Sequence, residues 1–365
     1  MLLKFLFFFS LNHFLYCSGT FTPVKALWVV RDYLTQKHLI NDVLDFASEN
    51  GFNHIFAQVR GRGDAYYNSE IVPKSHLVKN DFDPLEYLIK SNINSNIKIH
   101  AWINVYYLWS STNLPTQSDH LILNNPDWLD RQERDNYIKN ELYLRNKNRF
   151  TIDGEGFYLA PTNPAVNRYL ISVVDELSKN YNLDGIHYDY IRFHNSSYGY
   201  NEFGLSEFNR TNIDKFNANE EAIFSEFKRN SITNFVKNAR NKIKSNSDKI
   251  IISAAVKPNI YDAKLLFFQE WDLWLSAGYL DWAVPMNYMV KIDDFIQNIY
   301  LIRDNLPSKY HDKIVVGISI YNQNPRLAGK KIQKLRKMNI NNICIFSYSE
   351  FVKNSYYWKK LKKYF

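Results

Sequence analysis

Two ionisable side chains near the end of one apolar stretch are the strongest candidates for chemistry in this chain. The stretch runs Asp184-Gly-Ile-His-Tyr-Asp-Tyr-Ile-Arg-Phe193, and its middle has the composition of a buried strand. In a strand, His187 and Asp189 face the same side. Burying such groups is costly unless they are paired or used. Asp189 is therefore either a paired structural carboxylate or a functional one.

The patterns that several other chemistries require are missing from the sequence. Its nine histidines form no His-x-His or His-Glu-x-x-His pair, and two cysteines cannot form a metal-binding cluster. There is no Gly-x-Ser-x-Gly motif for a serine nucleophile, and no Gly-x-Gly-x-x-Gly or Walker pattern for a nucleotide. We therefore expect no metal and no cofactor, which leaves carboxylate chemistry.

Eight apolar runs, separated by helical patterns, are expected to position these groups. Alternating strands and helices predict a parallel sheet covered on both faces, and eight repeats predict a closed (β/α)8 TIM barrel. A doubly wound open sheet is the alternative, although it usually has fewer strands. The expected strands are Lys25–Asp32, His54–Arg60, Lys98–Tyr106, Asp184–Phe193, Lys249–Pro258, Asp281–Tyr288, Lys313–Tyr321 and Asn342–Tyr348.

Several helix boundaries and the strand spacing support this arrangement. Asp83-Pro84 and Asn163-Pro164 each place an N-cap residue before a first-turn proline, and Gly51 ends a helix predicted over 35–50. Most strands begin about 30 residues apart, but long intervals follow the third and fourth strands. Loops after the strands build the active site of such barrels, so we expect these two long loops to contact substrate.

Polar and aromatic residues gather at the predicted strand ends. Sugar rings have apolar C–H faces and hydroxyl edges, which suit Tyr and Trp side chains beside polar groups. Aromatic residues at this end include Tyr66, Tyr67, Tyr106, Tyr107, Trp109 and Tyr188. The expected substrate-binding residues are Arg31, Asp32, Gln58, Arg60, Trp102, Asn104, His187, Tyr190, Arg192, Lys257, Asn287 and Tyr288.

Seven motifs occur in order along roughly residues 24–350: Ala26-Leu-Trp-Val-Val-Arg31, Gln58-Val-Arg-Gly-Arg-Gly-Asp-Ala-Tyr-Tyr67, His100-Ala-Trp-Ile-Asn104, Tyr158-Leu-Ala-Pro161, Asp184-Gly-Ile-His-Tyr-Asp-Tyr-Ile-Arg192, Val284-Pro-Met-Asn-Tyr288 and Phe346-Ser-Tyr348. Together they resemble the glycosyl-hydrolase-like 10 family. The resemblance implies a (β/α)8 barrel, an exported bacterial protein and hydrolysis of glycosidic bonds. In one motif, Tyr158-Leu-Ala-Pro161, relatives often have Asp at the position of Ala160. If that Asp works in catalysis or orients a catalytic group, this chain is either an impaired enzyme or a protein that only binds sugar.

Glycoside hydrolysis generally needs two carboxyl groups, one that donates a proton and one that attacks or activates water. Asp189 is the first candidate, and its partner is left open among Asp64, Asp32 and Glu350. Nearby arginines would keep a carboxylate ionised, because a cation lowers its pKa. We expect a glycosidase that acts on a polysaccharide, with peptidoglycan glycan strands as one candidate. The alternative is a non-catalytic glycan-binding protein on the same barrel.

The two ends of the chain carry separate expectations. The apolar start and the small residues that follow predict a secretory signal peptide over 1–19, or a lipid anchor at Cys17. Export to the periplasm or the outside of the cell follows from either. The barrel is expected over 24–350, followed by a basic and aromatic tail over 351–365. The formal net charge of +8 is scattered without a basic-aromatic cluster, so we expect no nucleic-acid partner.

Overall fold

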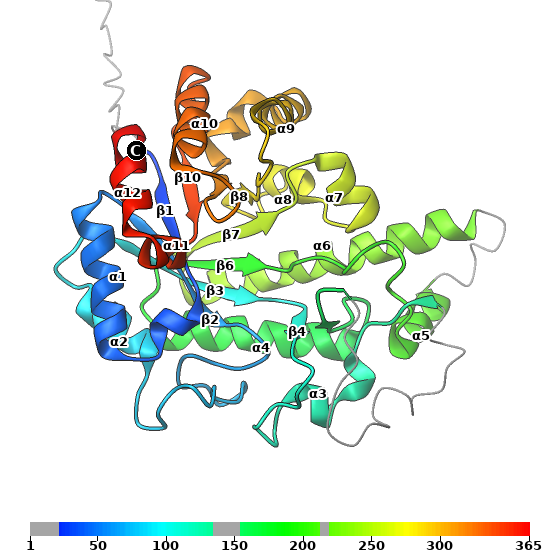
Figure 1. Cartoon of the computed structure of the whole chain (residues 1–365). Coiled ribbons are helices and arrows are strands. Elements are labelled where there is room, and N and C mark those ends of the chain that lie inside the picture. Colours follow the sequence, from blue (N-terminus) through cyan, green and yellow to red (C-terminus); the bar gives the residue numbers. More distant parts are fainter. Residues whose placement is uncertain (1–21, 134–153, 212–218) are drawn as a thin grey trace, which may run out of the picture.

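Eight parallel strands form a barrel at the centre of the computed structural model, which describes residues 22–133, 154–211 and 219–365 (Figure 1). Each strand lies within one of the eight apolar runs predicted from the sequence, so the predicted (β/α)8 architecture is confirmed. The strands are β1 (Lys25–Val29), β2 (His54–Arg60), β3 (Lys98–Asn104), β6 (Gly185–Asp189), β7 (Ile251–Val256), β8 (Trp282–Pro285), β9 (Val316–Ser319) and β10 (Ile343–Phe346).

The sheet closes on itself, which rules out the doubly wound alternative. Its strand order is β8-β7-β6-β3-β2-β1-β10-β9. The last gap, between β8 and β9, is bridged in parallel by the pairs Ala283–Ile314 and Met286–Gly317. In a closed barrel the carboxyl ends of all strands surround one mouth, so side chains from distant parts of the sequence meet there.

Helices surround the barrel, and local sequence explains where they begin. In α4, the Asn163 side chain accepts a hydrogen bond from the Ala165 N–H at 2.9 Å, and Pro164 follows in the first turn. Asp83 caps α2 in the same way. The main helices are α1 (Lys37–Glu49), α2 (Pro84–Ser91), α4 (Pro164–Asn180), α6 (Glu220–Asn246), α7 (Ile260–Leu266), α8 (Trp271–Ser276), α9 (Ile292–Asn305), α10 (Pro325–Lys337), α11 (Tyr348–Lys353) and α12 (Ser355–Leu361).

Two hydrophobic cores stabilise the fold. A large one lies between the strands and the helices, where α4 contributes Val166, Leu170 and Leu177. A smaller one includes Trp28 and Phe56, and large side chains of this kind fill the interior of such a barrel. The interior is therefore packed, and any substrate must bind above it.

Two long excursions follow β3 and β6. The described part of the first contains β4 (Tyr107–Trp109), α3 (Leu121–Asn124) and β5 (Phe157–Tyr158). β4 and β5 pair antiparallel and form a separate two-stranded sheet. The second excursion contains α5 (Glu202–Thr211) and α6, which packs against α4.

Residues 351–365, which we expected to form a tail, fold against the barrel instead. They include the end of α11 and all of α12, and the Trp358 ring lies 5.6 Å from that of Phe46 in α1. α12 also contacts α10, so it occupies the position of the helix after the eighth strand. The predicted signal peptide and Cys17 lie outside the described residues. Within the described segments, none of the helices combines the length and apolar character needed to cross a membrane.

Candidate active site

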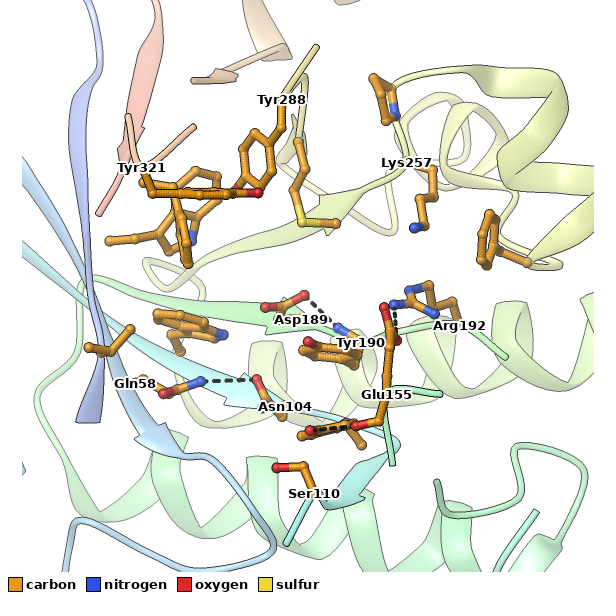
Figure 2. Close-up of a pocket in the computed structure, with 18 of the residues that line it drawn as sticks. Gln58, Asn104, Ser110, Glu155, Asp189, Tyr190, Arg192, Lys257, Tyr288 and Tyr321 are labelled. Carbon is orange, nitrogen blue, oxygen red and sulfur yellow. Dashed lines mark hydrogen bonds and ion pairs between the residues drawn. The ribbon is translucent and has the colours of Figure 1, made fainter. Parts of the chain in front are cut away.

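A cavity of about 740 Å³ lies at the carboxyl ends of the barrel strands (Figure 2). The register of the sheet brings Asn104 and Asp189 together, because these residues pair at the ends of β3 and β6. Both excursions and the loop after β7 add further residues to the wall. Of the residues predicted from the sequence, those on the wall are Arg31, Gln58, Trp102, Asn104, Asp189, Tyr190, Arg192, Lys257 and Tyr288.

Asp189 has the environment of a carboxylic acid that stays protonated unusually far up the pH range. It is the last residue of β6 and is 8% exposed. Its Oδ1 accepts a hydrogen bond from the Tyr190 N–H at 2.7 Å, and no ion pair reaches it among the described residues. Burial raises its pKa to about 6, against the smaller opposing effects of that hydrogen bond and of Arg192. Asp189 can therefore donate a proton near neutral pH.

Glu155 is the second carboxyl group of the pocket, and the sequence analysis did not identify it. The Arg192 Nη2 donates to Glu155 Oε2 at 2.8 Å, and the Tyr158 hydroxyl donates to the same oxygen. Burial raises the pKa of Glu155, but Arg192 and Tyr158 outweigh it and bring the pKa below the ordinary value. The Glu155 carboxylate is therefore ionised under conditions in which Asp189 keeps its proton.

Aromatic side chains fix the position of both carboxyl groups. The Tyr107 hydroxyl donates to the Glu155 carbonyl oxygen at 2.9 Å, and its ring stacks on Tyr190 with centroids 4.4 Å apart. Arg192 lies over the Tyr190 ring at 5.1 Å. Tyr190 itself has a positive φ of 50°, an uncommon conformation for a bulky residue. The packed aromatic cluster holds this strained residue directly after Asp189.

A hydrogen-bonded row of polar groups lines the wall beside Asp189. The Arg31 Nη1 donates to Gln58 Oε1 at 3.1 Å, and Gln58 Nε2 donates to Asn104 Oδ1 at 3.3 Å. Asn104 Nδ2 in turn donates to the Gly61 carbonyl at 2.9 Å. Each side chain is oriented by the next, which leaves their remaining donors and acceptors available to sugar hydroxyls.

The opposite wall is aromatic. Tyr288 stacks on Phe346 with ring centroids 5.6 Å apart, and Tyr321 meets both rings edge-on. Tyr321 is 54% exposed at the mouth of the pocket. Figure 2 shows Tyr288 and Tyr321 on the other side of Asp189 from Asn104. Flat apolar rings with a hydroxyl handle suit the faces of sugar rings.

The three carboxylates that we considered as partners of Asp189 do not line the pocket. Asp32 lies exposed in the short helix η1 (Arg31–Leu34), and Glu350 forms an ion pair with Lys353 at 2.8 Å in α11. Asp64 is buried in the loop after β2, where its Oδ1 accepts from the Arg62 N–H at 2.9 Å. Lying after a strand was therefore not sufficient to place a carboxylate on the pocket wall.

Three predicted binding residues also point elsewhere. Arg60 is fully buried and donates to the Asn104 carbonyl, so it supports the end of β3. Asn287 is fully buried and donates to the Phe295 carbonyl at 2.8 Å. His187 lies inside the barrel, where its Nε2 accepts from Trp28 Nε1 at 3.1 Å. Burial lowers the pKa of His187 to about 3, so its ring is neutral near pH 7. The hydrogen bond from Trp28 to this ring fixes the position of Trp28, which does line the pocket.

Ala160, the departure from the related motif, is also outside the pocket. It is fully buried, its N–H donates to the Trp128 carbonyl at 2.8 Å, and it is absent from the pocket wall. The departure from the related motif therefore does not change the residues that line this pocket. Among the described residues, no group of three or more His, Cys, Asp or Glu side chains could hold a metal ion.

Comparison with solved structures places the fold among glycoside hydrolase barrels. The glycoside hydrolase domain of PgaB (BpsB) from Bordetella bronchiseptica superposes with a TM-score of 0.70 at 12% identity, covering 93% of this chain and 98% of that one. Alpha-L-fucosidase isoenzyme 2 from Paenibacillus thiaminolyticus gives a TM-score of 0.62 at 15% identity. This superposition covers 94% of this chain and 49% of the fucosidase chain. At such low identity these similarities concern the fold.

Sequence comparison identifies relatives and a family. Glycosyl hydrolase DigH of Escherichia coli strain K12 is 26% identical over 276 residues, covering 69% of this chain and 58% of that protein. Glycosyl hydrolase YngK of Bacillus subtilis strain 168 is 22% identical over 276 residues, which cover 69% of this chain and 49% of YngK. The chain thus spans about half the length of these relatives. A family model, Glycosyl hydrolase-like 10, matches residues 21–345, so the chain belongs to the glycosyl hydrolase-like 10 family.

Proposed function

We propose that this protein hydrolyses glycosidic bonds in a polysaccharide, with Asp189 as the general acid and Glu155 as the nucleophile or general base. One observation carries the proposal: two carboxyl groups share a pocket, and their surroundings shift the two pKa values in opposite directions. Paired carboxyl groups with separated pKa values are what glycosidases use to assign the acid and the anionic role.

In the proposed reaction, the glycosidic bond lies between the two carboxyl groups. Asp189 donates its proton to the leaving oxygen as the bond to the anomeric carbon breaks. The ionised Glu155 carboxylate, which Arg192 and Tyr158 hold in place, attacks that carbon or activates the water that attacks it. The row from Arg31 to Asn104 binds sugar hydroxyls, and the Tyr288 wall packs against a ring face.

Peptidoglycan glycan strands are the first substrate to test. The predicted export would bring the protein to the cell wall. The family membership supports a glycosidase-type activity. The position of Ala160, away from the pocket, favours an enzyme over the non-catalytic glycan-binding alternative.

The test is the release of new reducing ends from glycan strands and other polysaccharides. We expect the wild type to release them, and Asp189→Asn and Glu155→Gln each to lower kcat by about 10²- to 10⁴-fold, the usual contribution of one acid or base. Glu86→Gln, on the exposed face of α2, is the matched control and should retain activity.

Two outcomes would count against the proposal. Full activity of Glu155→Gln on a substrate that the wild type cleaves would exclude the assigned pair. If the wild type binds glycans but releases no reducing ends from any of them, the non-catalytic glycan-binding alternative is the better description.

A further inference from the structure

Lys257 extends a cation into the pocket, and no carboxylate of the described residues forms an ion pair with it. It follows β7, and its backbone is held on both sides: its N–H donates to Gln269 Oε1 at 2.8 Å, and its carbonyl accepts from Trp271 Nε1 at 3.1 Å. Its ammonium lies 4.1 Å from the centre of the Phe267 ring. Figure 2 shows the side chain directed into the cavity, toward Glu155 and Arg192.

The pocket carries three carboxyl groups, on Glu155, Asp189 and Asp262, and in the described part of the chain none of them forms an ion pair with this ammonium. Arg192 donates hydrogen bonds to Glu155 and to two backbone carbonyls, so its charge is already paired with the Glu155 carboxylate. Glu155 is held by Arg192 and Tyr158, and Lys257 forms no ion pair within the described segments. Burial and Arg192 lower the pKa of Lys257 to about 8, so it is largely charged at neutral pH.

The opposite side of the pocket carries unneutralised cations as well. Arg31 donates to the neutral Gln58, and the Arg62 guanidinium lies over the Trp109 ring at 5.9 Å. In the described part of the chain, neither guanidinium has a carboxylate partner. The pocket wall therefore carries four cations, on Arg31, Arg62, Arg192 and Lys257, against three carboxyl groups, on Glu155, Asp189 and Asp262. Such a pocket attracts anions.

We propose that Lys257 binds a carboxylate carried by a sugar of the substrate, so that the pocket selects acidic glycans. This inference rests on the proposed function, because it takes the pocket as the glycan site. A partly buried ammonium gains far more from an anion than from a hydroxyl. A monoanion fits because Lys257 is a single point charge, and Arg192, the cation beside it, has its donors committed elsewhere.

The test measures binding rather than turnover, using pairs of sugars that differ by one carboxylate. Glucuronate against glucose places the carboxylate on carbon 6, and N-acetylmuramate against N-acetylglucosamine places it on an ether substituent. Dissociation constants of the whole protein come from NMR titration. We expect the acid of at least one pair to bind about 10- to 100-fold more tightly than its neutral partner, the size of a charge-assisted hydrogen bond.

Variants at position 257 assign the preference. Lys257→Met should abolish the preference, so that the acid and the neutral sugar of a pair bind equally, whereas Lys257→Arg should retain it. Lys309→Met is the matched control, because Lys309 also lies over a ring, Tyr310 at 5.0 Å, but does not line the pocket. The wild-type preference should decline as the pH rises through about 8.

Several results would overturn the inference. These are equal binding of acid and neutral sugars, a preference that survives in Lys257→Met, and no detectable binding of any of the four sugars. The proposed function fails separately. If the protein hydrolyses no glycan but shows a preference that depends on Lys257, the proposed glycosidase activity is refuted and the inference stands. If it hydrolyses glycans but shows no preference for acidic sugars, the inference is refuted and the proposed function stands.

Discussion

Asp189 and Glu155 are chemically alike, and their neighbours give them opposite tendencies. Asp189 receives a single backbone hydrogen bond and is surrounded by barrel side chains, so its ionised form is poorly solvated. One carboxylate oxygen of Glu155 accepts hydrogen bonds from the Arg192 guanidinium and from the Tyr158 hydroxyl. The raised pKa that suits Asp189 to proton donation also means that its ionisation destabilises the folded protein.

This cost gives a prediction for Asp189→Asn. The pKa of Asp189 is raised from 3.8 in the unfolded chain to about 6 in the folded one, so between these values the folded state binds more protons. Stability from this group is therefore complete below pH 3.8 and is lost as the pH rises through 6, by about 3 kcal/mol. Asn can keep the hydrogen bond from Tyr190 and carries no charge.

We expect Asp189→Asn to be more stable than the wild type at pH 7.5, by up to this amount, and to show no such gain at pH 3.5. Denaturant unfolding of both proteins at the two pH values measures the difference. A loss of about 3–5 kcal/mol at pH 7.5 would instead identify Asp189 as the buried partner of a cation.

The sequence could predict Asp189 but not Glu155, for a physical reason. Asp189 is located by strand periodicity and by the rule that barrel strands end at the active site. Glu155 reaches the pocket only because a chain segment after β3 folds back, and local patterns do not encode that return. A signal was present in Gly154 and Gly156, which flank Glu155 and both have positive φ. Two glycines around one carboxylate indicate a tight turn that presents it.

The β4–β5 pair is the element that delivers Glu155. Tyr107 in β4 pairs with Tyr158 in β5, and the Tyr107 hydroxyl binds the Glu155 backbone. Gly156 directly precedes β5 and has a φ of 126°. A Cβ added there would lie 2.3 Å from the carbonyl oxygen of Trp109 in β4. Only glycine permits this close approach of the two segments.

We therefore expect Gly156→Ala to push β5 from β4 and displace Glu155. Turnover should fall at least 10-fold, because small displacements of a catalytic group are costly, whereas the barrel should stay folded. Steady-state kinetics and circular dichroism measure the two effects. Gly278→Ala is the control: its φ of 71° is also positive, but a Cβ there meets nothing within 4 Å. Equal losses of turnover in both variants would refute the role of Gly156.

Over the molecule as a whole, the strands were more predictable than the chain end. A barrel strand is buried on both faces, so it appears in the sequence as a continuous apolar run. The end of the chain is rich in lysine and aromatic residues, and we therefore expected a basic and aromatic tail over 351–365. In the structure Tyr357, Trp358 and Leu361 are buried, and the lysines of α12 lie on its other face.

Trp358 tests whether this last helix is part of the barrel. Its ring lies 5.4 Å from that of Phe52 and 5.1 Å from that of Phe351, and its indole N–H donates to Asn50. Removing a buried ring of this size leaves a cavity, so Trp358→Ala should lower the free energy of unfolding by about 3–5 kcal/mol.

Activity should respond differently from stability, because no residue of α12 lines the pocket. Below its melting temperature, Trp358→Ala should keep the wild-type kcat on any substrate that the protein cleaves. Tyr356→Ala is the control from the same helix, since Tyr356 is 59% exposed and should cost little stability. If both variants melted like the wild type, the helix would contribute nothing to the barrel. A stability loss confined to Trp358→Ala means that the helix after the eighth strand closes the layer between α10 and α1.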